Sequence, residues 1–475
     1  MKQILILGAE ALPFAATGGL GDVLGSLPAA LCREGGVDVR VMLPLYRAVG
    51  AAYRAEMREV AEVPVTLAWR HTHCVVYALS RDGVTYYFLD APRYFDRDGL
   101  YGHFDDGERF AFFCIAALTA LPHLDFIPDV LHANDWQAAL AVIYLRTYFA
   151  GWAAYRRIRT LFTIHNIEYQ GKLPHAILGD VLGLEPTVLP MLDFDGCINL
   201  MKGAILYADR VSTVSPRYAE EICRAEFGRG LDGILRENAH KLCGILNGID
   251  EGLHDPLQAP IARPFSARSI GRKSENKCAL QRELGLMVSA ETPLLAVVSR
   301  LAAHKGLDLV CEVAEELLSQ DVQLVVLGCG DPALEGSFRD LEAAHKGRVC
   351  AYIGYDRALA TRIYAGCDLF LMPSRSEPCG LAQMIASRFG AIPVVRGVGG
   401  LYDSIKPYGE QGEEITGNGF VFAEDSGEAL LAATRAALTL WRDPARREVL
   451  VRRIMRTDFS WGRSAIAYKQ LYGVL

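Results

Sequence analysis

A predicted strand, loop and helix at residues 368–389 constrain the fold of this chain more than any other segment. The apolar run at residues 368–372 predicts a buried strand of a parallel sheet, and residues 382–389 predict a helix. The loop between them carries the carboxylate of Glu377 beside a Gly-Leu step, whose backbone N–H groups can face an anion at the helix N-terminus. Ligands bind outside the carboxyl ends of strands in open α/β sheets, so this loop is a candidate site. An ordinary surface connection is the alternative.

The same strand–loop–helix order recurs in both halves of the chain and predicts an α/β fold with two doubly wound domains. Residues 3–7 predict the first strand. A loop with Gly18 and Gly19 follows it at a helix start, where the backbone can approach a phosphate. A tight turn without a ligand explains the glycine pair equally well. Pro28 predicts that the following helix is interrupted and restarts.

The length of 475 residues exceeds what a single hydrophobic core usually supports, so two or more domains are expected. Apolar strands that end in glycine or charged residues continue well past the middle of the chain. We expect an N-terminal domain at residues 1–243 and a second domain at residues 244–456. A helix within residues 457–475 shows an apolar stripe and is expected to pack on the N-terminal domain.

Polar side chains follow two predicted strands of the N-terminal half. One strand ends in His132 and, three residues later, Asp135; another ends in His165 and Asn166. Two such strand ends suggest a shared polar cleft. The alternative is that each histidine is a hydrogen-bonded structural residue, which is the more common role of a lone histidine at a strand end.

Arg300 and Lys305 lie in a strand-to-helix connection of the second half. Two cations in such a connection suit a diphosphate ligand. Two solvated surface cations are the alternative. His71 and His73 share one face of a predicted strand, but no third ligand accompanies them, so no metal site is predicted.

The composition excludes several classes of protein. The net charge of −7 argues against a nucleic acid as the main partner, and no run of about 18 apolar residues predicts a membrane span. The N-terminus looks like a short strand rather than a signal peptide. The 12 cysteines include no C-x-x-C pair, which excludes the common zinc spacings and favours reduced thiols in the cytoplasm. The sequence does not indicate an oligomeric state.

Motifs along nearly the whole chain resemble those of bacterial glycogen synthases and plant starch synthases. In chain order they are Thr17-Gly-Gly-Leu20 with Asp22, His132-Ala-Asn-Asp-Trp136, His165-Asn-x-x-Tyr-Gln-Gly171, Asn247-Gly-Ile-Asp250, Lys273-x-Glu-Asn-Lys277, Ser299-Arg-Leu with Lys305-Gly306, Gly354-Tyr355 and Arg375-x-Glu-Pro-Cys-Gly-Leu381. The resemblance implies a GT-B fold, in which two Rossmann-like domains face each other across a cleft. It further implies transfer of glucose from ADP-glucose to an α-1,4-glucan such as glycogen, with retention of configuration and without a metal or other cofactor.

The resemblance also implies roles for individual residues. Arg300 and Lys305 would neutralise the diphosphate leaving group, and Tyr355 would stack on the adenine. The catalytic set would be His165, Arg300, Lys305, Glu377 and Asp135. The donor-binding set would be Gly18, Gly19, Asp22, Asn166, Asn247, Gly354, Tyr355, Cys379, Gly380 and Leu381.

Three positions depart from the pattern of the family. Ala16 stands where the family has a lysine, and Ala382 and Val398 each stand where it has a threonine. One cation and two hydroxyl groups are therefore missing near the expected donor. Besides a glycogen synthase of reduced activity, two alternatives stay open: a transferase with another nucleotide-sugar donor, and a catalytically weak regulatory paralogue that binds glucan or nucleotide.

Overall fold

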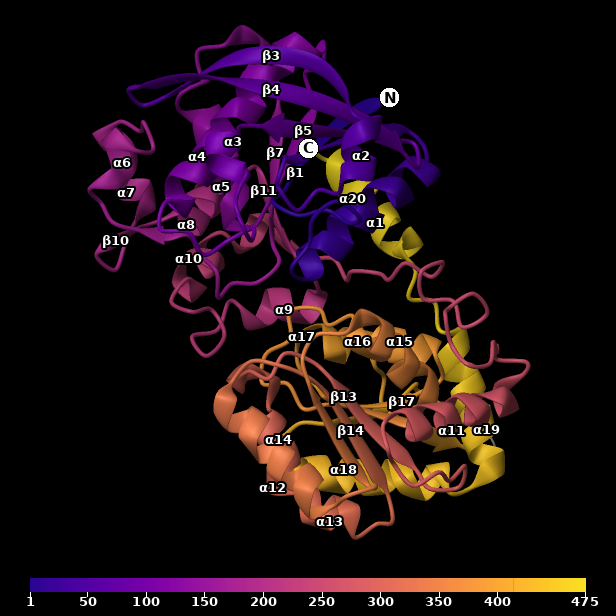
Figure 1. Ribbon diagram of the computed structural model, residues 1–475. Helices are drawn as coiled ribbons and strands as arrows, with labels where there is room; N and C mark the ends of the chain where they lie inside the picture. The colour runs from indigo at the N-terminus through magenta and orange to yellow at the C-terminus, as the bar shows by residue number, and fades with distance from the viewer. Residues whose placement is uncertain (413) are drawn as a thin grey trace. The chain divides into compact units, whose positions relative to one another are not determined.

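The computed structural model describes every residue of the chain except residue 413. The chain divides into two compact units (Figure 1). The first comprises residues 1–248 together with residues 461–475, and the second comprises residues 249–460. The predicted boundary at residue 243 comes too early, because β12 (Leu242–Gly244) pairs with β11 (Arg210–Thr213) in the sheet of the first unit.

The first unit is built around one sheet whose strands run in the order β12-β11-β7-β6-β1-β2-β5-β4-β3. The strands from β12 to β5 are parallel to their neighbours, while β4 and β3 are antiparallel. The remaining strand bounds are β7 Arg159–Ile164, β6 Val130–Asn134, β1 Lys2–Leu7, β2 Val37–Pro44, β5 Val84–Asp90, β4 Arg70–Arg81 and β3 Arg58–Leu67. Strand order reverses between β1 and β6, so the loops after these two strands lie at a topological switch point.

The main helices of the first unit are α1 (Gly19–Arg33), α4 (Asp106–Ala120), α5 (Asp135–Arg146), α8 (Leu200–Tyr207) and α20 (Trp461–Gly473). Helix α20 packs beside α1. The hydroxyl of Tyr472 on α20 lies 2.8 Å from Nδ1 of His132 on β6. The C-terminal helix therefore belongs to the core of the first unit, and it is drawn in yellow in Figure 1.

The predicted interruption of the first helix at Pro28 is wrong, because α1 is continuous with Pro28 inside it. An internal proline costs about 3 kcal/mol through a lost backbone hydrogen bond and ring clash. Leu24, Leu27 and Leu31 of α1 are almost completely buried. Burying such side chains contributes about 1.5–3 kcal/mol each, which outweighs the cost of the proline.

The second unit contains an all-parallel sheet in the order β15-β14-β13-β16-β17-β20. Its strands are β13 Leu294–Val298, β14 Gln323–Gly328, β15 Val349–Ile353, β16 Leu369–Met372, β17 Ile392–Arg396 and β20 Phe420–Phe422. The order reverses between β13 and β16, so this unit has its own switch point.

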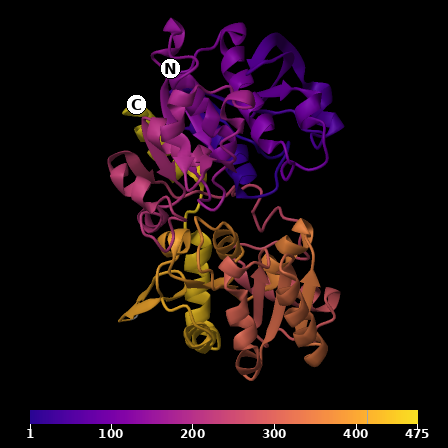
Figure 2. The same ribbon diagram turned by 90° about the vertical axis from the view of Figure 1, so that its left-hand side faces the viewer.

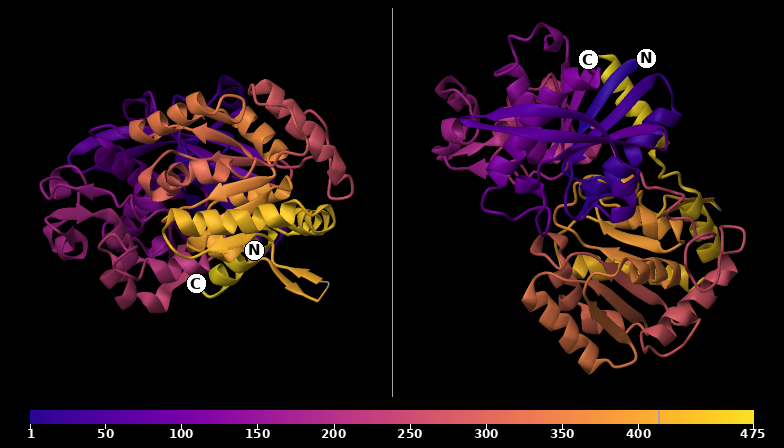
Figure 3. Two further views of the ribbon diagram at one scale, coloured as in Figure 1. Left: turned by 90° about the horizontal axis from the view of Figure 1, so that it is seen from below. Right: turned by 45° about the horizontal axis from the view of Figure 1, so that its top comes forward.

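Helices cover both faces of this sheet, as Figures 1 and 2 show. They include α11 Lys273–Glu283, α12 Leu307–Glu312, α13 Ala314–Leu318, α14 Pro332–Ala344, α15 Arg357–Gly366, α16 Ala382–Arg388, α17 Gly399–Ser404, α18 Gly427–Trp441 and α19 Pro444–Arg456. A small hairpin of β18 (Gly409–Gln411) and β19 (Glu414–Thr416) extends away from the body of the second unit (Figure 3).

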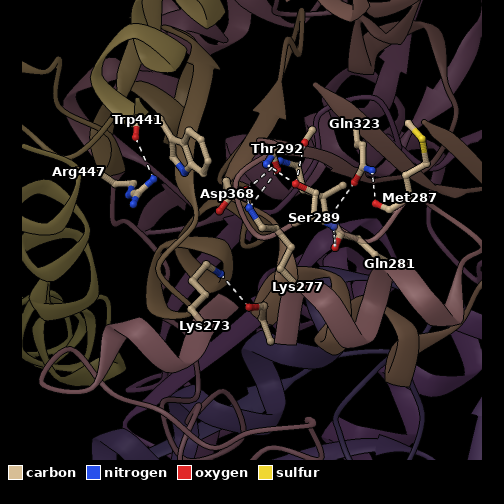
Figure 4. Close-up of polar contacts among 12 residues, drawn as sticks. Lys273, Lys277, Gln281, Met287, Ser289, Thr292, Gln323, Asp368, Trp441 and Arg447 are labelled. Atoms are coloured by element: carbon tan, nitrogen blue, oxygen red, sulfur yellow. Dashed lines mark hydrogen bonds and ion pairs between the residues drawn. The ribbon is translucent and has the colours of Figure 1, made fainter. Parts of the chain in front are cut away.

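Three side chains at four-residue spacing on α11 form a buried polar framework (Figure 4). Lys273 donates through Nζ to three backbone carbonyls of other segments. Lys277 donates to the Thr292 carbonyl at 3.0 Å and to Oδ2 of Asp368 at 2.8 Å, and Gln281 donates to Gln323 at 2.8 Å.

This framework lies at the amino ends of the strands. Oδ2 of Asp368, the residue before β16, also accepts from the backbone N–H of Leu294, the first residue of β13. Burial lowers the pKa of Lys273 to about 8. Through this lysine motif, α11 is fastened to the ends of α15 and α16 and to the amino ends of the strands, opposite the candidate loops.

Across the described part of the chain, none of the helices combines the length and the apolarity that a bilayer crossing requires.

Candidate active site

The candidate residues of the second unit follow the carboxyl ends of parallel strands in one sheet. Tyr355 follows β15, Arg300 and Lys305 follow β13, Glu377 follows β16, and Val398 follows β17. Strands β13 and β16 are adjacent, and they flank the switch point of this sheet. The strand order thus brings the two loops that the sequence singled out to the position where open α/β sheets bind ligands.

Lys305 and Glu377 form a mostly buried ion pair. Nζ of Lys305 lies 2.9 Å from Oε1 and 2.7 Å from Oε2 of Glu377, and the two side chains are 14% and 7% exposed. The hydroxyl of Ser374 donates to Oε2 at 2.9 Å. The predicted cation and the predicted carboxylate are therefore in direct contact.

The loop around Lys305 packs directly against the loop around Glu377. Gly306 has φ of +63°, and a Cβ atom there would lie 2.1 Å from the carbonyl oxygen of Pro373. Arg375 donates to both carboxylate oxygens of Asp308 at 2.7 Å and to the carbonyl of Ala303 at 2.9 Å. Its own backbone N–H donates to the carbonyl of His304 at 2.8 Å. Arg375 is thus a structural clamp between the two loops.

Gly380, Cys379 and Leu381 complete the second of these loops. Gly380 adopts φ of +69°, where a Cβ atom would meet Oε1 of Gln383 at 2.6 Å. The N–H of Gly400, beyond β17, donates to the carbonyl of Glu377 at 3.1 Å. Cys379 is buried, and Leu381 immediately precedes α16. The backbone of the Glu377 loop is therefore held by contacts with α16 and with the start of α17.

Arg300 and Tyr355 are not held in this way. Arg300 is exposed, and within the described residues its guanidinium has no hydrogen-bond or ion-pair partner. Tyr355 is 88% exposed and follows Gly354 at the end of β15. Both side chains are free to contact a ligand, and neither is brought into contact with Glu377.

In the first unit, the loops after the adjacent strands β6 and β7 bring Asp135 and His165 together. The backbone N–H of His165 donates to Oδ1 of Asp135 at 2.7 Å, and Nε2 of His165 donates to Oδ1 of Asn134 at 2.9 Å. Burial lowers the pKa of His165 to about 3, so its ring is neutral at physiological pH. We name Asp135, His165 and Asn166 the N-terminal cluster.

Asn166 and His132 have different roles. Oδ1 of Asn166 accepts from the backbone N–H of Glu168 at 2.9 Å, which leaves its amide group for another contact. His132 is fully buried, and its ring nitrogens contact Tyr472 at 2.8 Å and Thr163 at 2.6 Å. For His132, the structural alternative stated from the sequence is therefore the correct one.

Asp135 is unusual in its backbone and in its ionisation. It adopts a left-handed conformation with φ of +56° at the start of α5. Burial raises the pKa of its carboxyl group to about 7, against the opposing effect of backbone hydrogen bonds from His165 and Asn166. The charge of Glu10 raises this pKa further. Asp135 therefore changes charge close to neutral pH.

We expect Asp135→Asn to stabilise the protein progressively as the pH rises from about 4 to about 8. The folded-state pKa lies above the unfolded value of about 3.9, so the contribution of Asp135 to stability is full below pH 4 and is lost as the pH passes through 7. Asparagine cannot ionise, keeps an oxygen acceptor for the N–H of His165, and tolerates a left-handed backbone. Melting temperatures of both proteins across this pH range measure the difference.

Asp125→Asn is the matched control for this prediction, because Asp125 is exposed and also has a positive φ of +47°. A difference between Asp135→Asn and wild type that does not change with pH would contradict the assignment.

The glycine loop differs from the prediction at Gly18. The backbone N–H of Gly18 donates to Oε2 of the buried Glu10 at 3.2 Å, so it is not available to a phosphate. Gly19 begins α1, and Asp22 lies in its first turn. Glu10 was not among the predicted site residues, and its only signal in the sequence is an acidic residue shortly before a glycine pair.

Asn247 lies near the end of the first unit and is 6% exposed. In the part of the chain that the structure describes, its Oδ1 has no hydrogen-bond partner. A buried acceptor without a partner costs about 1–3 kcal/mol, so this oxygen is well suited to a ligand donor. The described residues contain no group of histidine, cysteine and acidic side chains arranged to hold a metal ion.

Comparisons with known proteins place similar glycosyltransferase sequences along nearly the whole chain. Residues 3–237 match the family model of the starch synthase catalytic domain, and residues 287–452 match that of the glycosyl transferases group 1. The chain is 47% identical over 473 residues to a glycogen synthase of Geobacillus thermodenitrificans, which covers 99% of this chain and 97% of the relative. It is 43% identical over 476 residues to a glycogen synthase of Anoxybacillus flavithermus, covering 100% of this chain and 98% of that protein.

Among solved structures, the chain is similar to the catalytic domain of starch synthase IV from Arabidopsis thaliana bound to ADP and acarbose. The TM-score is 0.90 at 35% identity, and the match covers 100% of this chain and 99% of that one. A sucrose-phosphate synthase from Thermosynechococcus elongatus matches with a TM-score of 0.60 at 19% identity, which shows a shared fold.

Proposed function

Because the chain belongs to the family of glycogen and starch synthases and has the GT-B fold, we propose that it transfers glucose from ADP-glucose to the non-reducing end of an α-1,4-glucan. The anomeric configuration is retained. The observation in this chain that best supports transferase chemistry is the buried contact between Lys305 and Glu377 at the switch point of the second unit. The relation to glycogen synthases over the full length supports the donor and the acceptor.

The predicted site residues would have different roles in the reaction. Arg300 and Lys305 would stabilise the negative charge that grows on the diphosphate as the glycosidic bond breaks. Glu377 would orient Lys305 and a glucosyl hydroxyl group. The neutral His165 would accept or donate one hydrogen bond to the glucosyl group, and Tyr355 would stack on the adenine. No metal ion or other cofactor is required in this scheme, since side-chain cations carry the charge stabilisation.

The three departures from the family lie in the glycine loop, at the start of α16 and in the loop before α17. Val398 precedes α17 without a side-chain capping hydrogen bond, where a threonine could supply one. Ala382 is the first residue of α16, and Ala16 is exposed. These three positions favour a slow enzyme. Among the described residues none of the cysteines forms a disulfide bond, and reduced thiols are typical of a cytoplasmic protein.

Transfer of labelled glucose into glycogen from ADP-glucose and from UDP-glucose, run side by side, tests the proposal. We expect incorporation from ADP-glucose to exceed that from UDP-glucose. Preference for UDP-glucose would favour the alternative donor, and binding of ADP without incorporation from either donor would favour the regulatory alternative.

We expect Ala16→Lys to raise kcat with ADP-glucose by about tenfold, which corresponds to roughly 1.4 kcal/mol of barrier. The new ammonium group would act mainly on charge that develops in the transition state, so kcat should change more than KM. Steady-state kinetics of the two proteins give the answer. Ala16→Met adds a chain of similar length without charge and is the matched control. A lysine variant no faster than wild type or than Ala16→Met would contradict the idea of a lost catalytic cation.

A further inference from the structure

We propose that Glu10 is a positioning residue that fixes the glycine loop, residues 16–19, for donor binding. The inference rests on the proposed function, because it assumes that this loop faces the nucleotide sugar. Glu10 acts through the backbone and side chain of Thr17 and through the backbone of Gly18.

The carboxylate of Glu10 is saturated with hydrogen bonds. Oε2 accepts from the backbone N–H of Thr17 at 2.6 Å and from that of Gly18 at 3.2 Å. Oε1 accepts from the hydroxyl of Thr17 at 2.8 Å and from that of Tyr101 at 2.7 Å. Glu10 is only 4% exposed, whereas residues 16–19 are all exposed. An exposed loop is thus tied to a buried charge, which accepts stronger hydrogen bonds than a neutral group does.

A second buried charge, Arg109, holds the segment of Tyr101, whose hydroxyl donates to Glu10. Arg109 is completely buried on α4. Its guanidinium donates to the carbonyls of Tyr94 at 2.7 Å and Leu100 at 3.1 Å, and it is also paired with Asp106. These contacts fix the segment that presents the hydroxyl of Tyr101. The glycine loop therefore depends on a relay from Arg109 through Tyr101 to Glu10.

The place of this relay in the fold connects it with the reaction. Glu10 lies in the loop after β1, and Asp135 follows the adjacent strand β6, at the switch point of the first unit. Glu10 is close enough for its charge to influence the ionisation of Asp135. With the N–H of Gly18 already engaged by Glu10, the loop would present the N–H of Gly19 at the start of α1 to the donor. Loss of the Glu10 carboxylate would leave the N–H of Gly19 poorly oriented toward the nucleotide sugar.

Tyr101→Phe removes one of the four hydrogen bonds and little else, so it is the primary test. We expect kcat with ADP-glucose to fall about fivefold to tenfold while KM changes less than twofold, because preorganised donors act mainly in the transition state. Glu10→Gln should lower kcat more, by about 10–100-fold, since an amide cannot accept four donors. Thr17→Val should behave like Tyr101→Phe, and Thr17→Ser, which restores the hydroxyl, should recover activity.

A double-mutant cycle separates a relay from two independent effects. In the Glu10→Gln background, Tyr101→Phe should reduce kcat by less than about twofold, because the loop that Tyr101 supports through Glu10 is already released. Glu34→Gln, at an exposed acidic residue of the same unit, is the matched control and should keep the wild-type rate. If Glu10→Gln does not fold, the Tyr101 and Thr17 variants decide by themselves. Rates within twofold of wild type in Tyr101→Phe and Thr17→Val would overturn the proposal.

Hydrogen exchange of residues 15–21 provides a readout that needs no turnover. The amides of Thr17 and Gly18 should be protected in the wild type and should exchange at least tenfold faster in Glu10→Gln. This result does not depend on which reaction the enzyme catalyses. A wild type that shows this protection but transfers no glucose would refute the proposed function alone. An active wild type whose exchange and rate are unaffected by the substitutions would refute the role of Glu10 alone.

Discussion

Arg300→Ala and Lys305→Ala are each expected to lower kcat with ADP-glucose by about 10²–10³-fold, the usual cost of losing one oriented donor to developing charge. The two variants test the same function in different structural settings. Arg300 is exposed and without a partner among the described residues, so its removal should change the free energy of unfolding by less than about 0.5 kcal/mol. Any loss of rate in Arg300→Ala is then a loss of contact with the ligand.

Lys305→Ala differs because it also breaks the contact with Glu377. The mostly buried carboxylate would keep the hydroxyl of Ser374 but would lose its cation. We therefore expect a lower melting temperature together with the lower kcat. Lys346→Ala, at an exposed lysine of the same unit, is the matched control. Near-normal turnover in both Arg300→Ala and Lys305→Ala would remove the diphosphate assignment.

Lys277→Met is expected to destabilise the second unit by about 3–5 kcal/mol, the typical cost of leaving a buried charge without its partner. Lys277 and Asp368 are 3% and 11% exposed, and Oδ2 of Asp368 would keep only the backbone N–H of Leu294. For a unit of this size, such a change lowers the melting temperature by roughly 6–20 °C. Differential scanning calorimetry of the full chain measures it.

The same helix provides the control. Glu283 on α11 pairs with Arg362, but these side chains are 40% and 32% exposed. Glu283→Ala should cost no more than about 1 kcal/mol, because solvent screens an exposed ion pair. Equal effects of Lys277→Met and Glu283→Ala would show that burial does not set the strength of the Lys277–Asp368 pair.

The fold class was predictable because its signals are local. Apolar runs followed by glycine or polar loops mark the parallel strands, and the alternation with helices fixes the α/β class. The two doubly wound domains are confirmed by the sheets of both units and by the similarity to a starch synthase structure. The helix break predicted at Pro28 does not occur, because the burial that overrides a proline depends on packing that the sequence of one helix does not reveal.

The candidate site was predictable only in part, for the same reason. Lys305 and Glu377 each stood in a recognisable loop, but their contact depends on β13 and β16 being neighbours, which requires the strand order. Glu10 was missed because its role depends on a hydrogen bond from Tyr101, which lies 91 residues away in the chain. The lysines of α11 appeared in a motif of the family, yet only burial shows that they support the sheet rather than bind a ligand.

The central claim is that this chain is a retaining, ADP-glucose-dependent α-1,4-glucosyltransferase. Proton NMR of ADP-glucose incubated with a maltooligosaccharide and the wild-type enzyme tests it most directly, because the anomeric signal reports both the linkage and its configuration as it forms. We expect ADP to be released in step with new α-1,4 linkages on longer oligosaccharides, and we expect Arg300→Ala to form them at least about 100-fold more slowly. A β linkage, hydrolysis to free glucose without chain extension, or an Arg300→Ala rate equal to that of the wild type would contradict it.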